Sequence, residues 1–217
     1  MTTTLIKMCG LSTPDAVEAA IKARADYIGL IFFAKSPRHV DLETARQIAM
    51  RSAGRTTRVG VFVDPDDGMM ADAIAAASLD AVQLHGKETP QRAAELKARF
   101  GLPVWKAISV RSASDIAAST LFHGIVDRLL FDAKTPDGAA LPGGMGIRFD
   151  WALMRGYKGP PGWGLSGGLS PDNVAEALAA TSAPLVDVSS GIESEPGVKD
   201  MDKIARFAYA VRHYDSH

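Results

Sequence analysis

Short apolar runs alternate with helical patterns along the whole chain, and this alternation restricts the fold more than any other feature. Each run of four to seven residues, rich in Val, Ile, Leu or Phe, is followed by a longer stretch with helical periodicity. Such an order is typical of parallel sheets built with right-handed crossovers. Strands are expected at Leu5 to Cys9, Tyr27 to Phe33, Arg58 to Val63, Ala81 to Leu84, Val104 to Ser109, Arg128 to Phe131, Gly162 to Leu165 and Pro184 to Val188.

Capping residues mark where several of the helices should begin. Ser, Thr or Asp accepts hydrogen bonds from the N–H groups of the first turn, and Pro fits the first helical position. A short helical piece is also expected near residues 149–154, and a final helix over residues 201–212. The expected caps are Thr13-Pro14 ahead of Asp15 to Ala23, Asp41 ahead of Leu42 to Arg51, Thr89-Pro90 ahead of Gln91 to Phe100, and Ser170-Pro171 ahead of Asp172 to Ala180.

The predicted fold class is α/β, as a single (β/α)8 TIM barrel over residues 1–217. Closure leaves no exposed sheet edge, whereas the alternative, an open doubly wound sheet, leaves two. A chain of 217 residues is long enough for one domain, and a complete barrel needs roughly 200 residues. In either fold ligands bind at the carboxyl ends of the parallel strands, so the residues there decide the function.

Charge and composition exclude several classes of protein. The 24 basic and 25 acidic residues give a net charge of -1, so no overall field attracts nucleic acid or an anionic membrane. No apolar stretch reaches the ~18 residues of a membrane span, and the N-terminus lacks a secretory pattern, so a cytoplasmic protein is expected. One cysteine excludes an internal disulfide, and the five histidines lack close metal-ligand spacing, so no metal site is expected.

Residues able to carry out chemistry gather at the expected carboxyl ends of the strands. They comprise a lone thiol, several carboxylates, an imidazole and an arginine, together with glycine-rich pieces, which is more than polar loops alone explain. The set is Cys9, Arg38, Asp64, His85, Asp132, Gly167, Gly168, Asp187, Ser189, Ser190 and Gly191.

Cys9 ends the first strand, and strand alternation predicts the direction of its neighbours. If Cys9 points into the barrel, Lys7 and Leu5 do so too, while Ile6 and Met8 pack against helices. Lys7 is then a buried cation that needs an acidic partner and could lower the pKa of a nearby thiol. An unreactive, packed thiol is the alternative, because free cysteines are often buried.

Two carboxylates stand where strands open to solvent. Asp132 follows Leu129-Leu130-Phe131, and partial shielding from water suits a carboxyl that acts as a general acid. The alternative is a turn residue that accepts a hydrogen bond from its own backbone. The same two interpretations apply to Asp187.

Glycine-rich pieces after the seventh and eighth strands predict a phosphate site. Gly167-Gly168 and Ser189-Ser190-Gly191 stand where (β/α)8 barrels commonly hold phosphate on backbone amides. Tight loops are the alternative reason for glycine there. Gly143-Gly144-Met145-Gly146, after the sixth strand, is interpreted as a lid over the barrel mouth.

Two further patterns receive structural interpretations. The stretch from Gly164 to Gly168 has the spacing of a nucleophilic-serine turn, but the residues before it are rich in Gly and Pro. Only two histidines, His213 and His217, follow it, and both lie near the C-terminus. Trp105 and Trp151 are interpreted as helix-facing or loop packing and not as a stacking platform.

Six ordered motifs span nearly the whole chain, from about residue 5 to residue 205. They are Lys7-Met8-Cys9-Gly10, Ala34-Lys35-Ser36-Pro37-Arg38, Val82-Gln83-Leu84-His85-Gly86, Pro142-Gly143-Gly144 with Gly146 and Phe149-Asp150-Trp151, Ser166-Gly167-Gly168-Leu169 with Pro171 and Asn173-Val174, and Val186 to Glu193 with Gly197-Val198-Lys199-Asp200. Together they resemble the phosphoribosylanthranilate isomerase family of tryptophan biosynthesis.

The resemblance implies an Amadori rearrangement that needs no cofactor, in which N-(5-phosphoribosyl)anthranilate becomes 1-(2-carboxyphenylamino)-1-deoxyribulose 5-phosphate. It implies Asp132 as general acid, Cys9 as general base and Arg38 as the group that holds the anthranilate carboxylate. The small-molecule substrate is the implied partner, and monomer and homodimer both stay open. By the same resemblance Lys7, His85 and Asp187 line the substrate site, and Gly167, Gly168, Ser189, Ser190 and Gly191 bind the phosphate.

Four residues depart from the family's usual pattern. Met145, Ile147 and Arg148 lie in the expected lid, and Ser166 stands where Ala is common. They bear on loop closure and leave every implied catalytic group in place. Two other functions stay open: a bifunctional barrel isomerase, whose family uses two aspartates and half-barrel repeats, and a phosphate-ligand-binding barrel without turnover.

Overall fold

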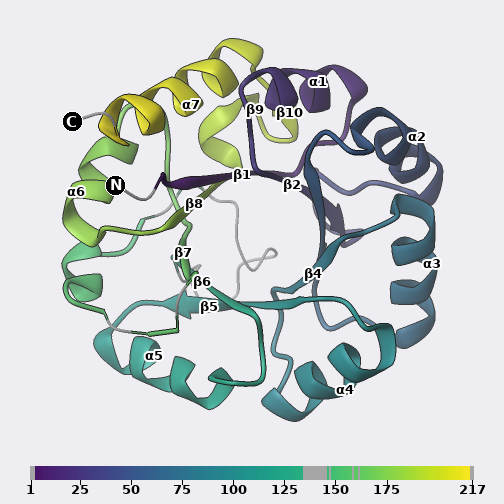
Figure 1. The fold of residues 1–217 in the computed structure, drawn as a ribbon, viewed down its shortest axis with the longest axis horizontal. Helices are drawn as coiled ribbons and strands as arrows, with labels where there is room; N and C mark the ends of the chain where they lie inside the picture. The colour runs from purple at the N-terminus through teal and green to yellow at the C-terminus, as the bar shows by residue number, and fades with distance from the viewer. Residues whose placement is uncertain (1–2, 134–145, 147, 158, 161, 216–217) are drawn as a thin grey trace.

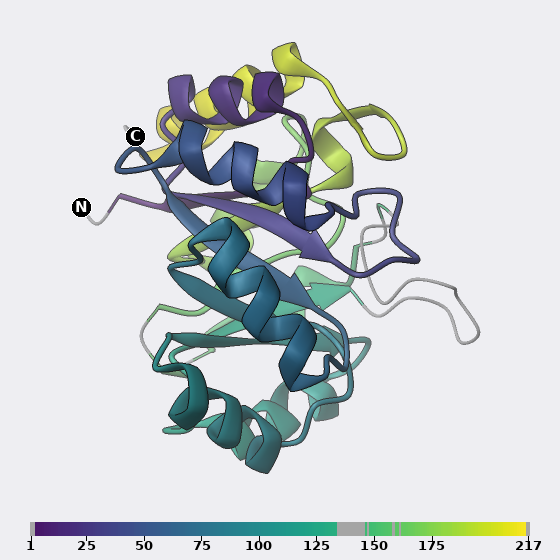
Figure 2. The same cartoon turned by 90° about the vertical axis from the view of Figure 1, so that its right-hand side faces the viewer.

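Eight parallel strands form a closed barrel in the computed structural model, which describes residues 3–133, 146, 148–157, 159–160 and 162–215. Each strand pairs with the next, and the eighth pairs with the first. Figure 1 looks along the barrel and shows the ring of strands inside a ring of helices, and Figure 2 shows the same arrangement from the side. This closure confirms the predicted TIM barrel and excludes the open sheet.

The observed strands match the predicted ones to within two residues at either end. The largest differences lie at the carboxyl end of the sixth strand, which continues to Ala133, and at the start of the seventh. The strands are β1 (Leu5–Cys9), β2 (Tyr27–Phe32), β3 (Thr57–Phe62), β4 (Ala81–Leu84), β5 (Val104–Val110), β6 (Arg128–Ala133), β7 (Gly164–Leu165) and β8 (Leu185–Val188).

Helices connect the strands, and three of the predicted caps are present. The side chains of Thr13, Asp41 and Thr89 each accept a hydrogen bond from a first-turn N–H group. Helices α3 and α5 and a small hairpin, β9 with β10, were not among the predicted elements. The elements are α1 (Pro14–Lys22), α2 (Leu42–Ser52), α3 (Asp67–Ala77), α4 (Pro90–Phe100), α5 (Ala113–Ala118), α6 (Val174–Thr181), α7 (Met201–Asp215), β9 (Glu193–Glu195), β10 (Val198–Lys199) and the 3-10 turns η1 (Ser119–Phe122), η2 (Trp151–Met154) and η3 (Ser190–Ile192).

The predicted cap of α6, Ser170-Pro171, is wrong. The helix begins only at Val174, because Asn173 folds back on the preceding loop. The side chain of Asn173 accepts a hydrogen bond from the Ser170 N–H and donates one to the Gly168 carbonyl. This side chain therefore braces the loop after β7 and does not cap the helix.

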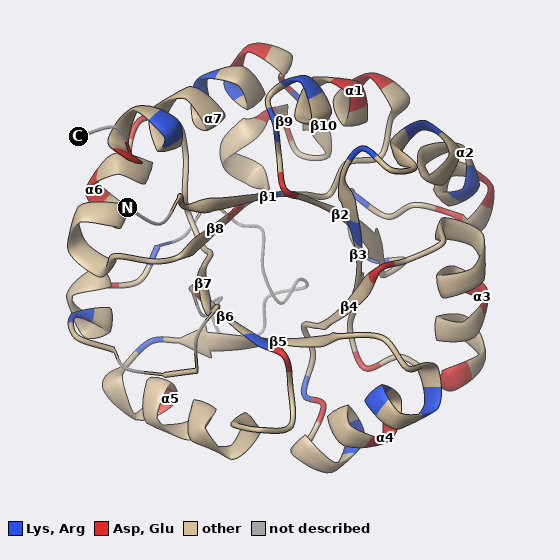
Figure 3. Cartoon of the chain, viewed as in Figure 1, with Lys and Arg blue, Asp and Glu red and all other residues tan. Residues whose placement is uncertain are grey.

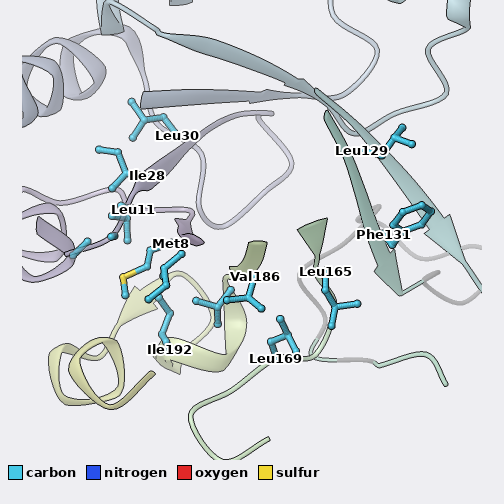
Figure 4. Close-up of a cluster of buried hydrophobic side chains, with 14 of the residues drawn as sticks. Met8, Leu11, Ile28, Leu30, Leu129, Phe131, Leu165, Leu169, Val186 and Ile192 are labelled. Atoms are coloured by element: carbon cyan, nitrogen blue, oxygen red, sulfur yellow. The ribbon is translucent and has the colours of Figure 1, made fainter. Parts of the chain in front are cut away.

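The main hydrophobic core lies between the strands and the helices. Ile6 and Met8 of β1 belong to it, as predicted from their alternation with Cys9. Figure 4 shows part of this cluster, where Met8, Val186 and Leu165 from neighbouring strands lie with Ile192 of the turn η3. The outward faces of the strands thus provide most of the apolar burial that holds the barrel to its helices.

The inside of the barrel changes from apolar to polar along its axis. A second, smaller cluster fills the end where the strands begin, and it includes Leu5, Val59, Leu130 and Leu185. Trp105 also belongs to this interior cluster and packs edge-on against Tyr27 at 5.0 Å, so its predicted helix-facing position is wrong. Trp151 is buried in the outer core, as predicted.

Charged residues lie mainly on the outer ring of helices. Figure 3 shows residues of both signs around this ring, with neither sign gathered on one side. Within the described residues, no helix combines the length and the apolar composition that a membrane crossing needs. A few charged residues point into the barrel: Lys7, Asp132 and Asp187 lie toward its carboxyl-terminal end, and Arg128 lies at the opposite end over the Trp105 ring.

Candidate active site

Several of the inward-pointing side chains toward the carboxyl ends of the strands are polar. Because side chains alternate along a strand, Lys7 and Cys9 follow Leu5 on the inner face of β1, and Asp187 follows Leu185 on β8. Gln83 on β4 and Asp132 on β6 reach the same space. All of these side chains are buried, so each needs a hydrogen-bonding or ionic partner.

Lys7 and Asp187 form a buried ion pair between neighbouring strands. The two residues stand opposite each other in the β1–β8 register, and Lys7 Nζ lies 3.0 Å from both carboxylate oxygens. Burial by itself lowers the pKa of Lys7, but Asp187 and Cys9 raise it, and the net result lies above the ordinary value. The ammonium therefore stays charged, and the predicted acidic partner of Lys7 is Asp187.

The thiol of Cys9 lies against Lys7 at the end of β1. Burial raises the pKa of Cys9 above its ordinary value, although the ammonium of Lys7 acts in the opposite direction. The expected lowering by Lys7 is thus present, but burial outweighs it. Gly29 on β2 makes room for the thiol, because a Cβ there would lie 2.6 Å from Sγ.

A hydrogen-bonded chain links β4 to the carboxylate of β6. Gln83 Nε2 lies 3.1 Å from Nδ1 of His85, and Nε2 of His85 lies 3.1 Å from Oδ2 of Asp132. Asp187 interacts electrostatically with both His85 and Asp132. The thiol, the ammonium, both carboxylates and the imidazole therefore form one connected group at the barrel mouth.

Arg38 lies beside this group in a second charged cluster. Its Nε and Nη2 donate to the two carboxylate oxygens of Glu193 at 2.7 and 2.8 Å. Lys199 donates to Glu193 at 2.7 Å and to the Ser189 carbonyl at 2.9 Å. Burial lowers the pKa of Lys199 although Glu193 opposes this, and the hydrogen bonds from Arg38 and Lys199 hold the pKa of Glu193 below its ordinary value against the effect of burial.

The glycine-rich loops after β7 and β8 lie side by side. A Cβ on Gly191 would fall 1.8 Å from the Leu169 carbonyl oxygen, so only glycine fits where these loops meet. A cavity of about 660 Å³ opens here, lined by Arg38, Gly168, Ser190 and Gly191 among others. Arg38 brings a positive charge to this cavity, and Glu193, its ion-pair partner, lines the cavity too.

Comparison with known proteins shows the family to which the chain belongs. The family model of N-(5'-phosphoribosyl)anthranilate (PRA) isomerase matches residues 6–210. The chain belongs to this family. It is 50% identical over 207 residues to the N-(5'-phosphoribosyl)anthranilate isomerase of Zymomonas mobilis, with 95% of this chain and 97% of the relative covered. The corresponding protein of Paramagnetospirillum magneticum is 48% identical, with 95% and 96% covered.

Solved structures of the PRA isomerase family share the fold. The phosphoribosyl anthranilate isomerase of Thermotoga maritima has a TM-score of 0.88 at 32% identity, with 97% of this chain and all of that chain covered. Another, solved in complex with reduced 1-(o-carboxyphenylamino)-1-deoxyribulose 5-phosphate, has a TM-score of 0.82 at 30% identity, with 97% and 100% covered. The chain is therefore an isomerase of tryptophan biosynthesis, which excludes the binding barrel without turnover.

Most of the predicted site residues lie together at the barrel mouth, but Asp64 and Arg148 do not. Asp64 accepts a hydrogen bond from the Lys87 N–H, and thus serves the loops beside β3 and β4. Arg148 lies over the Trp151 ring and near Glu176 on the outer side. Most of the predicted lid, including Gly143, Gly144, Met145 and also Ile147, lies outside the described residues.

Three polar residues of the site were not singled out from the sequence. Gln83, Glu193 and Lys199 occur in the resembling motifs, but no local pattern distinguishes them from solvent-facing residues. Their burial depends on strand register and on the β9–β10 hairpin, which bring distant segments together. Over the part of the chain that the structure describes, no group of three or more His, Cys, Asp or Glu side chains could hold a metal ion.

Proposed function

We propose that this PRA isomerase catalyses the Amadori rearrangement of N-(5-phosphoribosyl)anthranilate with Asp132 as general acid and Cys9 as general base. The observation that carries the proposal is that β6 and β1 bring a carboxyl and a thiol to one buried group, connected through His85, Asp187 and Lys7. One group that gives a proton and one that takes a proton are what an aldose-to-ketose rearrangement requires.

The acid step opens the ribose ring. Asp132 gives a proton to the ring oxygen, the bond between that oxygen and C1′ breaks, and the anthranilate nitrogen supplies the electron pair that forms a C1′=N iminium. His85, which lies against Oδ2 of Asp132, holds the carboxyl in place. A buried carboxyl gives up its proton to a developing hydroxyl without competition from bulk water.

The base step moves a proton from C2′. Cys9 thiolate takes this proton, and the C2′–H electron pair forms the C1′=C2′ bond of an enolamine while the iminium nitrogen regains its lone pair. The enol then tautomerises to the C2′ ketone as C1′ gains a proton. Lys7 stands against the thiol and stabilises its thiolate form.

Two further groups hold the ends of the substrate. Arg38, oriented by its fork with Glu193, binds the anthranilate carboxylate from the edge of the cavity. The phosphate binds to the loops of Gly167, Gly168, Ser189, Ser190 and Gly191, close to Lys199. The ribose then lies between these ends, above Cys9 and Asp132.

Single substitutions test the two roles. We expect Cys9→Ser and Asp132→Asn each to lower kcat/KM for phosphoribosylanthranilate by at least about 100-fold, as for loss of a general base or acid. Substrate consumption by the purified protein gives the rates, and circular dichroism checks that each variant is folded. Near-normal turnover in either variant would remove that residue from its proposed role.

A further inference from the structure

Gln83 is a buried polar residue that the mechanism does not yet use. It lies on β4 two residues before His85, so both side chains point into the barrel. Only 1% of Gln83 is exposed, and its Oε1 has no hydrogen-bond partner among the described residues. Its Nε2 lies 3.1 Å from Nδ1 of His85. A buried amide with an unpartnered oxygen costs stability, so its presence calls for another explanation.

In an uncharged His85 ring, the contact with Gln83 decides which nitrogen carries the proton. An amide N–H that donates to Nδ1 requires a lone pair there, which leaves the proton on Nε2. The Nε2–H then donates to Oδ2 of Asp132 at 3.1 Å. With Oδ2 occupied, Oδ1 is left to carry the acidic proton, and it faces Gly167, where a Cβ would lie 2.7 Å from it.

Rotating the Gln83 amide by half a turn reverses the donor and acceptor in its contact with His85. Oε1 of Gln83 would then accept from Nδ1–H of His85, and Nε2 of His85, now without a proton, would face Asp132. The N–H of Gln83 that now contacts His85 would then lose its partner, in place of Oε1, which lacks one in the observed orientation. Buried N–H groups without partners are rarer than buried oxygens without partners, so the observed orientation is favoured.

We propose that Gln83 is a positioning residue that holds His85 in the Nε2–H tautomer and so directs the proton of Asp132 to Oδ1. The inference rests on the proposed role of Asp132 as general acid. The positioning role gives the buried Gln83 amide a purpose at a position where Leu would fill the same space. A fixed neighbour that selects the tautomer of a histidine is a recurring device at sites of proton transfer.

The tautomer itself is measurable in the unaltered protein. Side-chain 15N–1H correlation spectra of protein labelled at histidine distinguish a pyrrole-type nitrogen, which carries the proton, from a pyridine-type nitrogen. The signals of His85 are assigned by their absence from His85→Asn. We expect pyrrole-type Nε2 and pyridine-type Nδ1, and the opposite assignment overturns the proposal whether or not the Gln83 variants fold.

Two substitutions of Gln83 then test its control over His85. Gln83→Leu removes both amide groups, so we expect mixed tautomers and a fall in kcat of at least about 10-fold, with KM changed much less. Gln83→Glu keeps the shape, and its ionised carboxylate offers only acceptors, so we expect a proton to appear on Nδ1 at a pH where this carboxylate is ionised. An unchanged His85 spectrum in both variants, or an unchanged kcat in Gln83→Leu, overturns the proposal.

A matched control separates positioning from general loss of a buried polar group. Thr181 on α6 is buried on the outer side of the barrel, and its hydroxyl donates to the Ala177 carbonyl at 2.7 Å. Thr181→Val should leave both the His85 spectrum and kcat unchanged, and a similar loss there would mean that the Gln83 effects are merely structural. The spectra do not depend on turnover. If Asp132→Asn stays active, the acid role of Asp132 is rejected, and the spectra of His85 still decide whether Gln83 controls its tautomer.

Discussion

Replacing Lys7 by Met tests whether the buried ion pair with Asp187 supports both stability and the thiol. Met has a similar length and no charge, so packing at the centre of the barrel is largely preserved. The carboxylate of Asp187 would lose an ammonium that lies 3.0 Å from both of its oxygens. The side chains of Lys7 and Asp187 are 0% and 5% exposed, so water cannot replace the lost partner.

The size of the effect follows from this burial. Breaking a buried pair from one side costs about 3–5 kcal/mol, mostly from the charge left behind. In urea, with a slope of about 2–3 kcal/mol per molar, the midpoint should fall by about 1–2 M. The double variant Lys7→Met with Asp187→Leu leaves no unpaired charge, so most of the lost stability should return.

Urea unfolding followed by circular dichroism measures the stability of wild type, Lys7→Met, Asp187→Leu and the double variant. Arg206→Met is the surface control, because the Arg206–Asp172 pair is 60% and 78% exposed, and its midpoint should not move. If Lys7→Met loses less than about 1 kcal/mol, or if the double variant is no more stable than either single variant, the pair does not act as one buried unit.

The remaining predictions concern Arg38, Glu193 and Cys9. Arg38→Ala should raise KM for phosphoribosylanthranilate at least about 10-fold in steady-state assays, because a charge-assisted contact is lost, and an unchanged KM and kcat/KM would rule out its binding role. The pKa of Glu193 is lowered by folding, so its ionised form stabilises the folded state at pH values above its ordinary pKa of 4.5. This stabilisation is lost as the pH falls through the pKa that Glu193 has in the folded protein. Glu193→Gln should therefore lose less unfolding free energy on acidification than wild type, and equal acid sensitivity would refute this. Because folding raises the pKa of Cys9, the unfolded chain releases the thiol proton at a lower pH than the folded protein does. Wild type should therefore lose stability relative to Cys9→Ala as the pH rises above about 9. A constant difference in unfolding free energy between the two proteins would contradict the raised pKa.

The barrel itself could be predicted from the sequence because its signals are local. Each strand is a short apolar run, and Thr13, Asp41 and Thr89 are ordinary cap residues placed before periodic stretches. The cap of α6 failed because a tertiary contact intervened: Asn173 binds the Gly168 loop, which delays the helix until Val174. Helix α3 is mostly alanine and methionine with little contrast between its faces, so its periodicity is weak.

The site could be predicted only in part. Alternation along β1 gave the inward direction of Lys7 and Cys9, and the position of Asp132 followed from the end of an apolar strand. The ion-pair partners could not be predicted from the sequence. Barrel closure brings Asp187 to Lys7 across 180 residues, and Glu193 meets Arg38 across 155 residues. Local patterns carry no information on such pairings.

The same alternation explains why the environments of Cys9 and Asp132, the proposed base and acid, cannot be tuned separately in this barrel. The inward residues where the strands begin are mostly apolar, whereas several toward the carboxyl ends are polar and buried, so each of these must be paired. Lys7 serves the thiol and Asp187 together, and Asp187 in turn acts on His85 and Asp132. A change at Lys7 therefore reaches Cys9, the proposed general base, directly, and Asp132, the proposed general acid, through one intermediate carboxylate. Substitutions in this group should show coupling energies in place of additive effects.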